Sequence, residues 1–332
     1  MLKKKILVIS DSLRNLPDAV AALTGCGHAI EYIDGLVDFR QIVAGRLGNL
    51  SGADAIIMGR VMNTDAEALA LASRAKVIAL HTSGSDNVDL AEATLRGITV
   101  TNVKGVNSEQ CAEFSIGLML AVTRQILAGD RAIRAGRWAA DTQSSLDLYG
   151  ATLSVIGLGM IGKAAVRRAA AFGMKILVHT RTPDHAFGEE FGIEYVDKNE
   201  VLARGDVVSL YASLSDQTHH MIGAPEIALM QPHAYLINIA RGELIDEDAL
   251  FEALVGKRIA GAGLDVFAVE PLHSSRFFAL PNVVLTPHQA GLARTAKSNA
   301  AVRAVGNAIA VLAGRLPTDA INPSAFTSGT MQ

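Results

Sequence analysis

The sequence is poor in cysteine, in aromatic residues and in net charge. Its 332 residues include two cysteines and one tryptophan, 5% are aromatic, and the formal net charge is −3. Cys26 and Cys111 cannot form a disulfide framework and show no metal-ligand spacing, which predicts a reducing, cytoplasmic setting and no metal site. Because the net charge is small and negative, no global basic field favours binding to nucleic acid.

Long hydrophobic runs are also lacking. The apolar residues that follow the N-terminal lysines stop at Ile9, which is too short for the core of a signal peptide. The most apolar stretch, Phe114–Val122, is interrupted by Thr123 and Arg124, so we expect no contact with a membrane. Half of the residues are nevertheless hydrophobic, mostly small or aliphatic, which is typical of an α/β enzyme.

The most informative stretch is a glycine loop with its flanking elements. Leu153–Ile156 predicts a buried strand, a G-x-G-x-x-G motif follows it, and an Ala-rich helix and a second strand over 175–179 come next. This strand–turn–helix–strand context is the one a dinucleotide fingerprint requires; the alternative is a tight turn that binds nothing. We expect the pyrophosphate to lie at the helix N-terminus. The loop residues expected to bind the cofactor are Gly157, Gly159, Met160, Ile161 and Gly162.

Predicted strands and helices alternate along the rest of the chain. This pattern predicts an α/β fold with two Rossmann-like open parallel-sheet domains and a cleft between them. Residues 1–103, together with about 292–332, should form one flavodoxin-like domain, and residues 104–291 should form a nucleotide-binding Rossmann domain inserted in it. A buried helix is expected from Asn107 to about Gln125, and Pro317–Gln332 is expected to be a polar tail.

Three ionisable residues follow strands of the second predicted domain, where ligands collect in open α/β sheets. Arg241 would hold an anionic substrate by paired hydrogen bonds, and His288 would exchange a proton. Glu270 would pair with the histidine and favour its imidazolium form. Taken singly, each is more often a surface ion pair or an ordinary loop residue. Together, beside a dinucleotide, they indicate a hydride transfer coupled to a proton transfer.

The sequence closely resembles the D-isomer-specific 2-hydroxyacid dehydrogenases from about Asp54 to Pro317. Besides the glycine loop, the segments that carry the resemblance are Gly84–Asp89, Gly97–Val103, Ala112-Glu113, Ala135–Trp138, Ile239–Gly242, Gly263–Phe267, Glu270-Pro271 and Thr286–His288. The resemblance implies an oxidoreductase that reversibly reduces a 2-keto acid to a D-2-hydroxy acid with NAD(P)H. It also implies that the 107–150 segment forms a homodimer interface.

The resemblance implies roles for individual residues. Arg241 would bind the substrate carboxylate and carbonyl, His288 would be the acid/base, and Glu270 would be its partner. Asp265 would approach the nicotinamide carboxamide, and Ala240 would lie in the same cofactor site. The first domain would bind the substrate, and its backbone amides that would hold the carboxylate belong to Ser83, Gly84 and Ser85.

The end of the second strand of the glycine unit bears on the cofactor. Thr180 stands where an NAD-specific site usually carries Asp or Glu, and Arg181 and Thr182 follow it. No carboxylate remains there to repel a 2′-phosphate, and Arg181 would pair with that phosphate. We therefore expect NADP(H) to be preferred and NAD(H) to be possible, with Asp184 nearby keeping the NAD alternative open.

The identity of the substrate is less determined. Leu80 stands where phosphoglycerate dehydrogenases carry an Arg, although Arg60 matches another Arg that those enzymes have near the substrate. A small unphosphorylated keto acid of the glyoxylate/hydroxypyruvate type is expected, and a D-3-phosphoglycerate dehydrogenase-like activity is the alternative. Formate dehydrogenases share the fold but carry Gln in place of Glu270. A nucleotide-sensing corepressor-like interaction protein is a further alternative, disfavoured by the short C-terminal tail.

Overall fold

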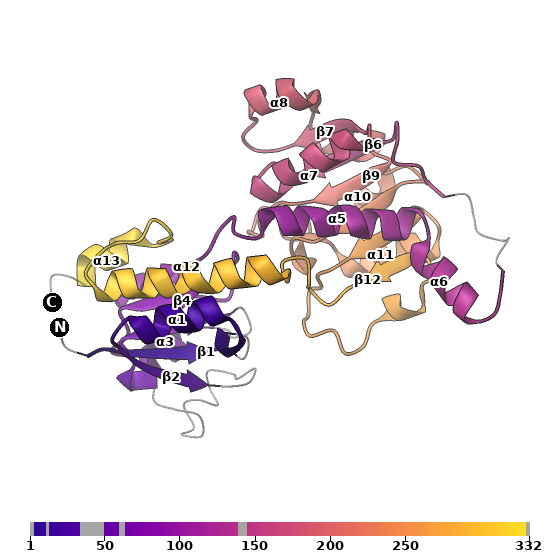
Figure 1. Cartoon of the computed structure of the whole chain (residues 1–332). Helices are drawn as coiled ribbons and strands as arrows, with labels where there is room; N and C mark the ends of the chain where they lie inside the picture. Colours follow the sequence, from indigo (N-terminus) through magenta and orange to yellow (C-terminus); the bar gives the residue numbers. More distant parts are fainter. Residues whose placement is uncertain (1–2, 11–12, 34–49, 60–63, 139–144, 330–332) are drawn as a thin grey trace. The chain divides into compact units, whose positions relative to one another are not determined.

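Two parallel sheets organise the chain (Figure 1). The computed structural model describes residues 3–10, 13–33, 50–59, 64–138 and 145–329. The chain divides into two units, Met1–Asn107 with Ala293–Gln332, and Ser108–Leu292. The prediction of two α/β Rossmann-like sheets is confirmed.

The first unit contains a five-stranded sheet in the order β2-β1-β3-β4-β5, in which neighbouring strands are parallel. Its strands are β1 (Lys5–Ile9), β2 (Ala29–Ile33), β3 (Ala55–Met58), β4 (Val77–Leu80) and β5 (Thr99–Thr101). Its helices are η1 (Leu13–Asn15), α1 (Pro17–Gly25), η2 (Leu50–Gly52), α3 (Ala66–Leu71), α4 (Leu90–Leu95), α12 (Arg294–Leu312) and α13 (Pro323–Gly329). The central strands β3 and β4 are buried along their whole length, because helices cover both faces of a parallel sheet.

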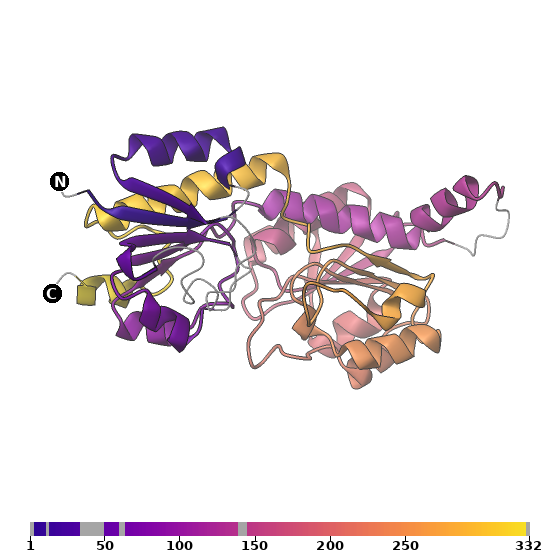
Figure 2. The same cartoon turned by 90° about the horizontal axis from the view of Figure 1, so that it is seen from below.

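The chain returns to the first unit through α12, which lies against α1, β3 and β4 (Figure 2). As far as residue 329, the segment that we expected to be a polar tail packs against α4 and β5 of this unit. Ala320 bridges Thr101 in antiparallel fashion, and the side chain of the buried Asn322 accepts a hydrogen bond from the Val100 amide at 2.7 Å. These contacts satisfy backbone groups at the edge of β5 that would otherwise need another partner.

The second unit contains a seven-stranded sheet in the order β12-β11-β10-β9-β6-β7-β8, again with parallel neighbours. Its strands are β6 (Thr152–Ile156), β7 (Lys175–His179), β8 (Ile193–Tyr195), β9 (Val207–Leu210), β10 (Tyr235–Asn238), β11 (Gly261–Leu264) and β12 (Val283–Leu285). Its helices are α5 (Ser108–Thr123), α6 (Ile126–Arg134), α7 (Met160–Ala171), α8 (His185–Phe191), α9 (Lys198–Arg204), α10 (Ala224–Leu229), η3 (Gly242–Leu244), α11 (Glu247–Val255) and η4 (Arg276–Ala279).

Helix α5 packs against α7 and against β10, β11 and β12, which explains why its faces are so apolar. It ends at Thr123, and Gln125 adopts a left-handed conformation with φ of 52° before α6 begins. Among the residues described, no single helix has the length and apolarity to span a membrane. Only α5 and α6 taken together would pass, and they are bent by 60°.

Candidate active site

The glycine loop joins β6 to α7, and two of its glycines have no room for a side chain. Gly157 has φ of +98°, which L-residues with side chains rarely adopt. A Cβ on Gly162 would lie 2.4 Å from the carbonyl oxygen of Gly157, whereas a Cβ on Gly159 would meet nothing within 4 Å. The loop is therefore tightly packed at Gly157 and Gly162, whereas the space next to Gly159 is open.

The open side of this loop suits a pyrophosphate. Helix α7 begins at Met160, and its N-cap residue, Gly159, provides no side-chain hydrogen bond. The first amides of a helix have no partner inside the helix, and the helix dipole favours an anion near them. Gly157, Gly159, Met160, Ile161 and Gly162 thus fit the phosphates of a dinucleotide.

The end of β7 carries the residues that we expect to select the cofactor. Thr180 lies beside the glycine loop, where the Leu158 amide donates to its Oγ1 over 3.4 Å. Arg181 and Thr182 follow it and are exposed. In the described part of the chain, no hydrogen bond or ion pair engages the Arg181 guanidinium, so it is available to a ligand.

Asp184 is already engaged by its own surroundings. Its Oδ1 accepts the Phe187 amide at 3.1 Å as the N-cap of α8, and Lys163 Nζ contacts its Oδ2 at 2.5 Å. The hydrogen bond from Lys163 holds the pKa of Asp184 below its usual value. A ribose hydroxyl would have to compete with both partners for this carboxylate.

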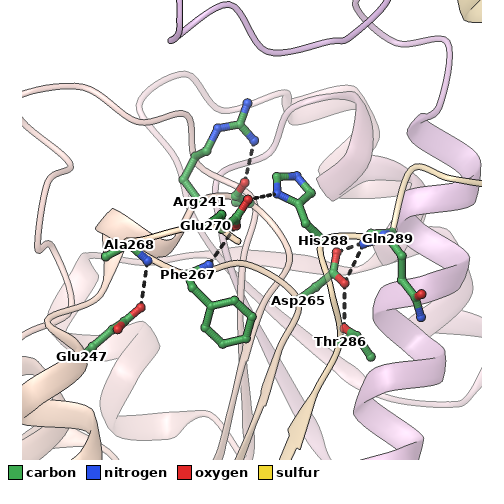
Figure 3. Close-up of polar contacts among 11 residues, drawn as sticks. Arg241, Glu247, Asp265, Phe267, Ala268, Glu270, Thr286, His288 and Gln289 are labelled. Carbon is green, nitrogen blue, oxygen red and sulfur yellow. Dashed lines mark hydrogen bonds and ion pairs between the residues drawn. The ribbon is translucent and has the colours of Figure 1, made fainter. Parts of the chain in front are cut away.

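The three expected catalytic residues come together after β10, β11 and β12 (Figure 3). His288 Nδ1 donates to Glu270 Oε2 at 2.7 Å, and Glu270 Oε1 accepts the Phe267 amide at 3.0 Å. Arg241 lies next to this pair, and its Nη1 donates to the carbonyl of Ala240 at 2.7 Å. A histidine–glutamate ion pair beside a guanidinium provides a proton donor and an anion ligand in one place.

Asp265 holds the loop that carries His288. Its buried carboxylate accepts hydrogen bonds from the Thr286 hydroxyl at 2.6 Å and from the amides of Gln289 and Ala290, each at 2.9 Å. Its own carbonyl accepts the His288 amide at 2.7 Å. Burial raises the pKa of Asp265, although these donors act in the opposite direction. They stabilise the left-handed backbone of His288, which has φ of 49°.

Two further positioning contacts were missed at the sequence level. Asn238 is fully buried at the end of β10; its Oδ1 accepts the Ala240 amide at 3.0 Å, and its Nδ2 donates to the carbonyl of Arg241 at 2.8 Å. Glu247, at the start of α11, accepts the Ala268 amide at 2.8 Å (Figure 3). A buried Asn directly after a strand could have signalled the first contact. The second depends on non-local packing.

The remaining expected residues lie in the first unit. Ser83, Gly84 and Ser85 form a half-buried loop after β4, and Leu80 is a buried residue of that strand. Arg60, expected to bind substrate, lies outside the described residues. Within those described, no group of three or more His, Cys, Asp or Glu side chains is placed to hold a metal ion.

Comparison with known proteins places the chain in a family. Residues 116–290 match the D-isomer specific 2-hydroxyacid dehydrogenase NAD binding domain. The chain is 40% identical over 282 residues to a glyoxylate reductase of Thermococcus litoralis, covering 83% of this chain and 85% of that protein. The fold and site therefore define a nicotinamide-dependent oxidoreductase, and the chain belongs to the D-isomer specific 2-hydroxyacid dehydrogenase family.

Two other relatives bear on its specificity. A D-3-phosphoglycerate dehydrogenase of Mycobacterium bovis is 35% identical over 317 residues, which are 96% of this chain but 58% of that protein. The crystal structure of a glyoxylate reductase from Paecilomyes thermophila superposes with a TM-score of 0.84 at 30% identity, covering 96% of this chain and 98% of that one.

Proposed function

We propose that this protein is a reductase of small, unphosphorylated 2-keto acids of the glyoxylate/hydroxypyruvate type, with NADP(H) preferred over NAD(H). The single observation that supports this most strongly is the His288–Glu270 ion pair at 2.7 Å, with Arg241 beside it. The pair can give a proton to a developing alkoxide, and the guanidinium can hold a carboxylate. In the reverse direction the same groups take the proton from a D-2-hydroxy acid.

The reaction divides between the cofactor and the side chains. When bound, the dihydronicotinamide supplies the hydride that reduces the carbonyl carbon. Arg241 orients the keto acid through its carboxylate and carbonyl oxygens. His288, in its imidazolium form, donates the proton to the carbonyl oxygen, and Glu270 stabilises that form. Asp265 keeps the His288 loop in place and would lie near the nicotinamide carboxamide when the cofactor is bound.

The preference for NADP(H) rests on the end of β7. Thr180 replaces the carboxylate that would repel a 2′-phosphate, and Arg181 is exposed beside it. Asp184 is engaged by Lys163 and by the α8 amide. A 2′-phosphate can therefore pair with Arg181 and accept hydroxyl hydrogen bonds from Thr180 and Thr182.

Glyoxylate reductases are among the more similar relatives, and this favours an unphosphorylated substrate. We infer that the first unit binds the substrate, with the amides of Ser83, Gly84 and Ser85, and with Arg60, as further ligands of its anionic groups. A D-3-phosphoglycerate dehydrogenase-like activity is the second candidate, supported by the relative of that name. Leu80, an apolar residue, replaces one cation that a phosphate would need.

We also propose that the protein is a cytoplasmic homodimer that pairs through the 107–150 segment. Ile126 and Ile133 of α6 are 53% and 56% exposed, and Trp138 and Tyr149 are 91% and 85% exposed. Apolar side chains gathered in one segment favour contact with another protein surface. Sedimentation equilibrium should give twice the chain mass for the natural protein and the single-chain mass for Ile133→Glu; a natural protein that sediments as a monomer would contradict the proposal.

The function is tested with a panel of glyoxylate, hydroxypyruvate, pyruvate and phosphohydroxypyruvate, each with NADPH and NADH. We expect kcat/KM to be highest for glyoxylate or hydroxypyruvate with NADPH. Arg181→Ala should raise the KM for NADPH by about tenfold to a hundredfold, because a charge-assisted hydrogen bond contributes roughly 1.5–3 kcal/mol. The matched control is Arg204→Ala, a surface Arg paired with Glu194 and Glu200. A tenfold preference for NADH in the natural protein would contradict the cofactor assignment.

A further inference from the structure

The loop after β4 has its carbonyl groups engaged and its amides available. The Thr82 carbonyl accepts the Val103 amide at 3.1 Å, and the Gly84 carbonyl accepts the Thr82 hydroxyl at 2.9 Å. The Ser83 carbonyl accepts Asn102 Nδ2 at 2.9 Å. By contrast, no described residue accepts a hydrogen bond from the amides of Ser83, Gly84 or Ser85.

Each of these carbonyls sets the direction of the next amide. A trans peptide unit is planar, so its C=O and N–H groups point in opposite directions. The Ser83 carbonyl and the Gly84 amide belong to one such unit. When Asn102 holds that carbonyl towards the sheet, the Gly84 amide must point away from it. Neighbouring amides aimed to the same side form a concave site for an anion.

Asn102 is well placed to hold this peptide unit. It directly follows β5 and is 7% exposed. Its backbone amide donates to the carbonyl of Asp319 at 3.3 Å, so the segment after α12 helps to fix its position. Of the three carbonyl contacts, this is the one that a side chain from outside the loop provides, and removing it would leave the peptide unit free to turn.

We infer that Asn102 is a positioning residue for the substrate: its side-chain amide holds the Ser83–Gly84 peptide so that the Gly84 amide meets the carboxylate of the 2-keto acid. This inference rests on the proposed function. It adds a role for Asn102, which would act on the substrate through the loop.

The test compares substrate binding with cofactor binding. Asn102→Ala should raise the KM for glyoxylate and the inhibition constant of oxalate by about tenfold, since a buried carbonyl loses its partner. The dissociation constant of NADPH, measured by fluorescence, and kcat should stay within about twofold of the natural protein. An unchanged oxalate inhibition constant in a folded Asn102→Ala protein would overturn the inference.

Asn102→Asp provides a readout that a general loss of stability would not produce. An ionised carboxylate cannot donate to the Ser83 carbonyl, but a protonated one can. We therefore compare the oxalate inhibition constants of this variant and of the natural protein at the same pH. The ratio of the variant constant to the natural one should fall from pH 8 to pH 5. A ratio that is independent of pH would count against the inference. This variant keeps the side-chain shape and so remains usable if the alanine variant does not fold.

The control is Ser298→Ala, also in the first unit. The Ser298 hydroxyl donates to the Asp18 carboxylate at 3.0 Å and is bonded neither to the loop nor to Asp319. It should keep the natural KM for glyoxylate, and an equal rise in both alanine variants would overturn the inference. If the natural protein reduces no keto acid, the proposed function itself fails. If the natural protein does reduce a keto acid but the Asn102 variants behave like it, only the inference about Asn102 fails.

Discussion

Acidification should destabilise the first unit through one imidazole whose Nε2 atom is buried. His81 follows β4, and its Nε2 is buried with no hydrogen-bond partner among the described residues. A Cβ built on Gly59 would lie 3.1 Å from that nitrogen, so little space remains around it. Burial lowers the pKa of His81 from 6.5 to about 4, because the imidazolium would lose its hydration.

The sign and size of the effect follow from linkage. Between the unfolded pKa of 6.5 and the folded pKa of about 4, the unfolded unit binds a proton that the folded unit does not. The stability contributed by neutral His81 is therefore fully present above the unfolded pKa of 6.5, and it is lost as the pH falls towards the folded pKa. Relative to pH 8, the free energy of unfolding should drop by about 2 kcal/mol at pH 5 and about 3 kcal/mol at pH 4.

The assay is hydrogen exchange of peptides that cover β3 and β4, corrected for the intrinsic pH dependence of exchange. The natural protein should lose protection between pH 8 and pH 5, whereas His81→Leu should lose much less, because it has no proton to bind. His273→Leu is the control, since His273 is exposed. A pH dependence that is the same in the natural protein and in His81→Leu would refute the reasoning.

Three further changes have defined outcomes. Gly162→Ala places a Cβ 2.4 Å from the Gly157 carbonyl oxygen and should lower the stability of the second unit by about 1–3 kcal/mol. It should also weaken NADPH binding, measured by fluorescence, and an unchanged affinity would contradict the packing argument. Glu270→Gln removes the carboxylate that accepts from His288 Nδ1 at 2.7 Å and should slow reduction by about tenfold or more; unchanged turnover would exclude this role. Asn322→Ala loses three hydrogen bonds, two of them buried, and should lower the stability of the first unit by about 3 kcal/mol in thermal unfolding; an unchanged melting temperature would show that they matter little.

Much of the second unit was predictable because its signals are local. The glycine spacing, the strand before it and the Ala-rich helix after it lie within about one βαβ unit, and sterics alone require Gly157 and Gly162. Arg241, Glu270 and His288 were predictable as a group because parallel strands end at the same edge of a sheet. Their positions relative to one another follow directly from that topology.

Features that depend on distant parts of the chain could not be predicted in this way. The segment after α12 reads as polar, yet Asn322 is buried because it satisfies backbone groups of β5, more than 200 residues earlier. The three-residue strand β8 is too short for a periodic signal. Nor does the sequence reveal that the Asp265 carboxylate accepts the amides of Gln289 and Ala290, since only the folded loop after β12 brings those donors to it.

The most direct test of the account is the NADPH-dependent reduction of glyoxylate by the natural protein and by His288→Ala across pH. We predict that the natural rate of reduction falls as the pH rises, because reduction consumes a proton, while oxidation of the hydroxy acid shows the opposite trend. His288→Ala should bind NADPH normally but reduce glyoxylate about a hundredfold or more slowly, the usual contribution of general acid catalysis. Turnover that is unchanged in His288→Ala would contradict the central claim.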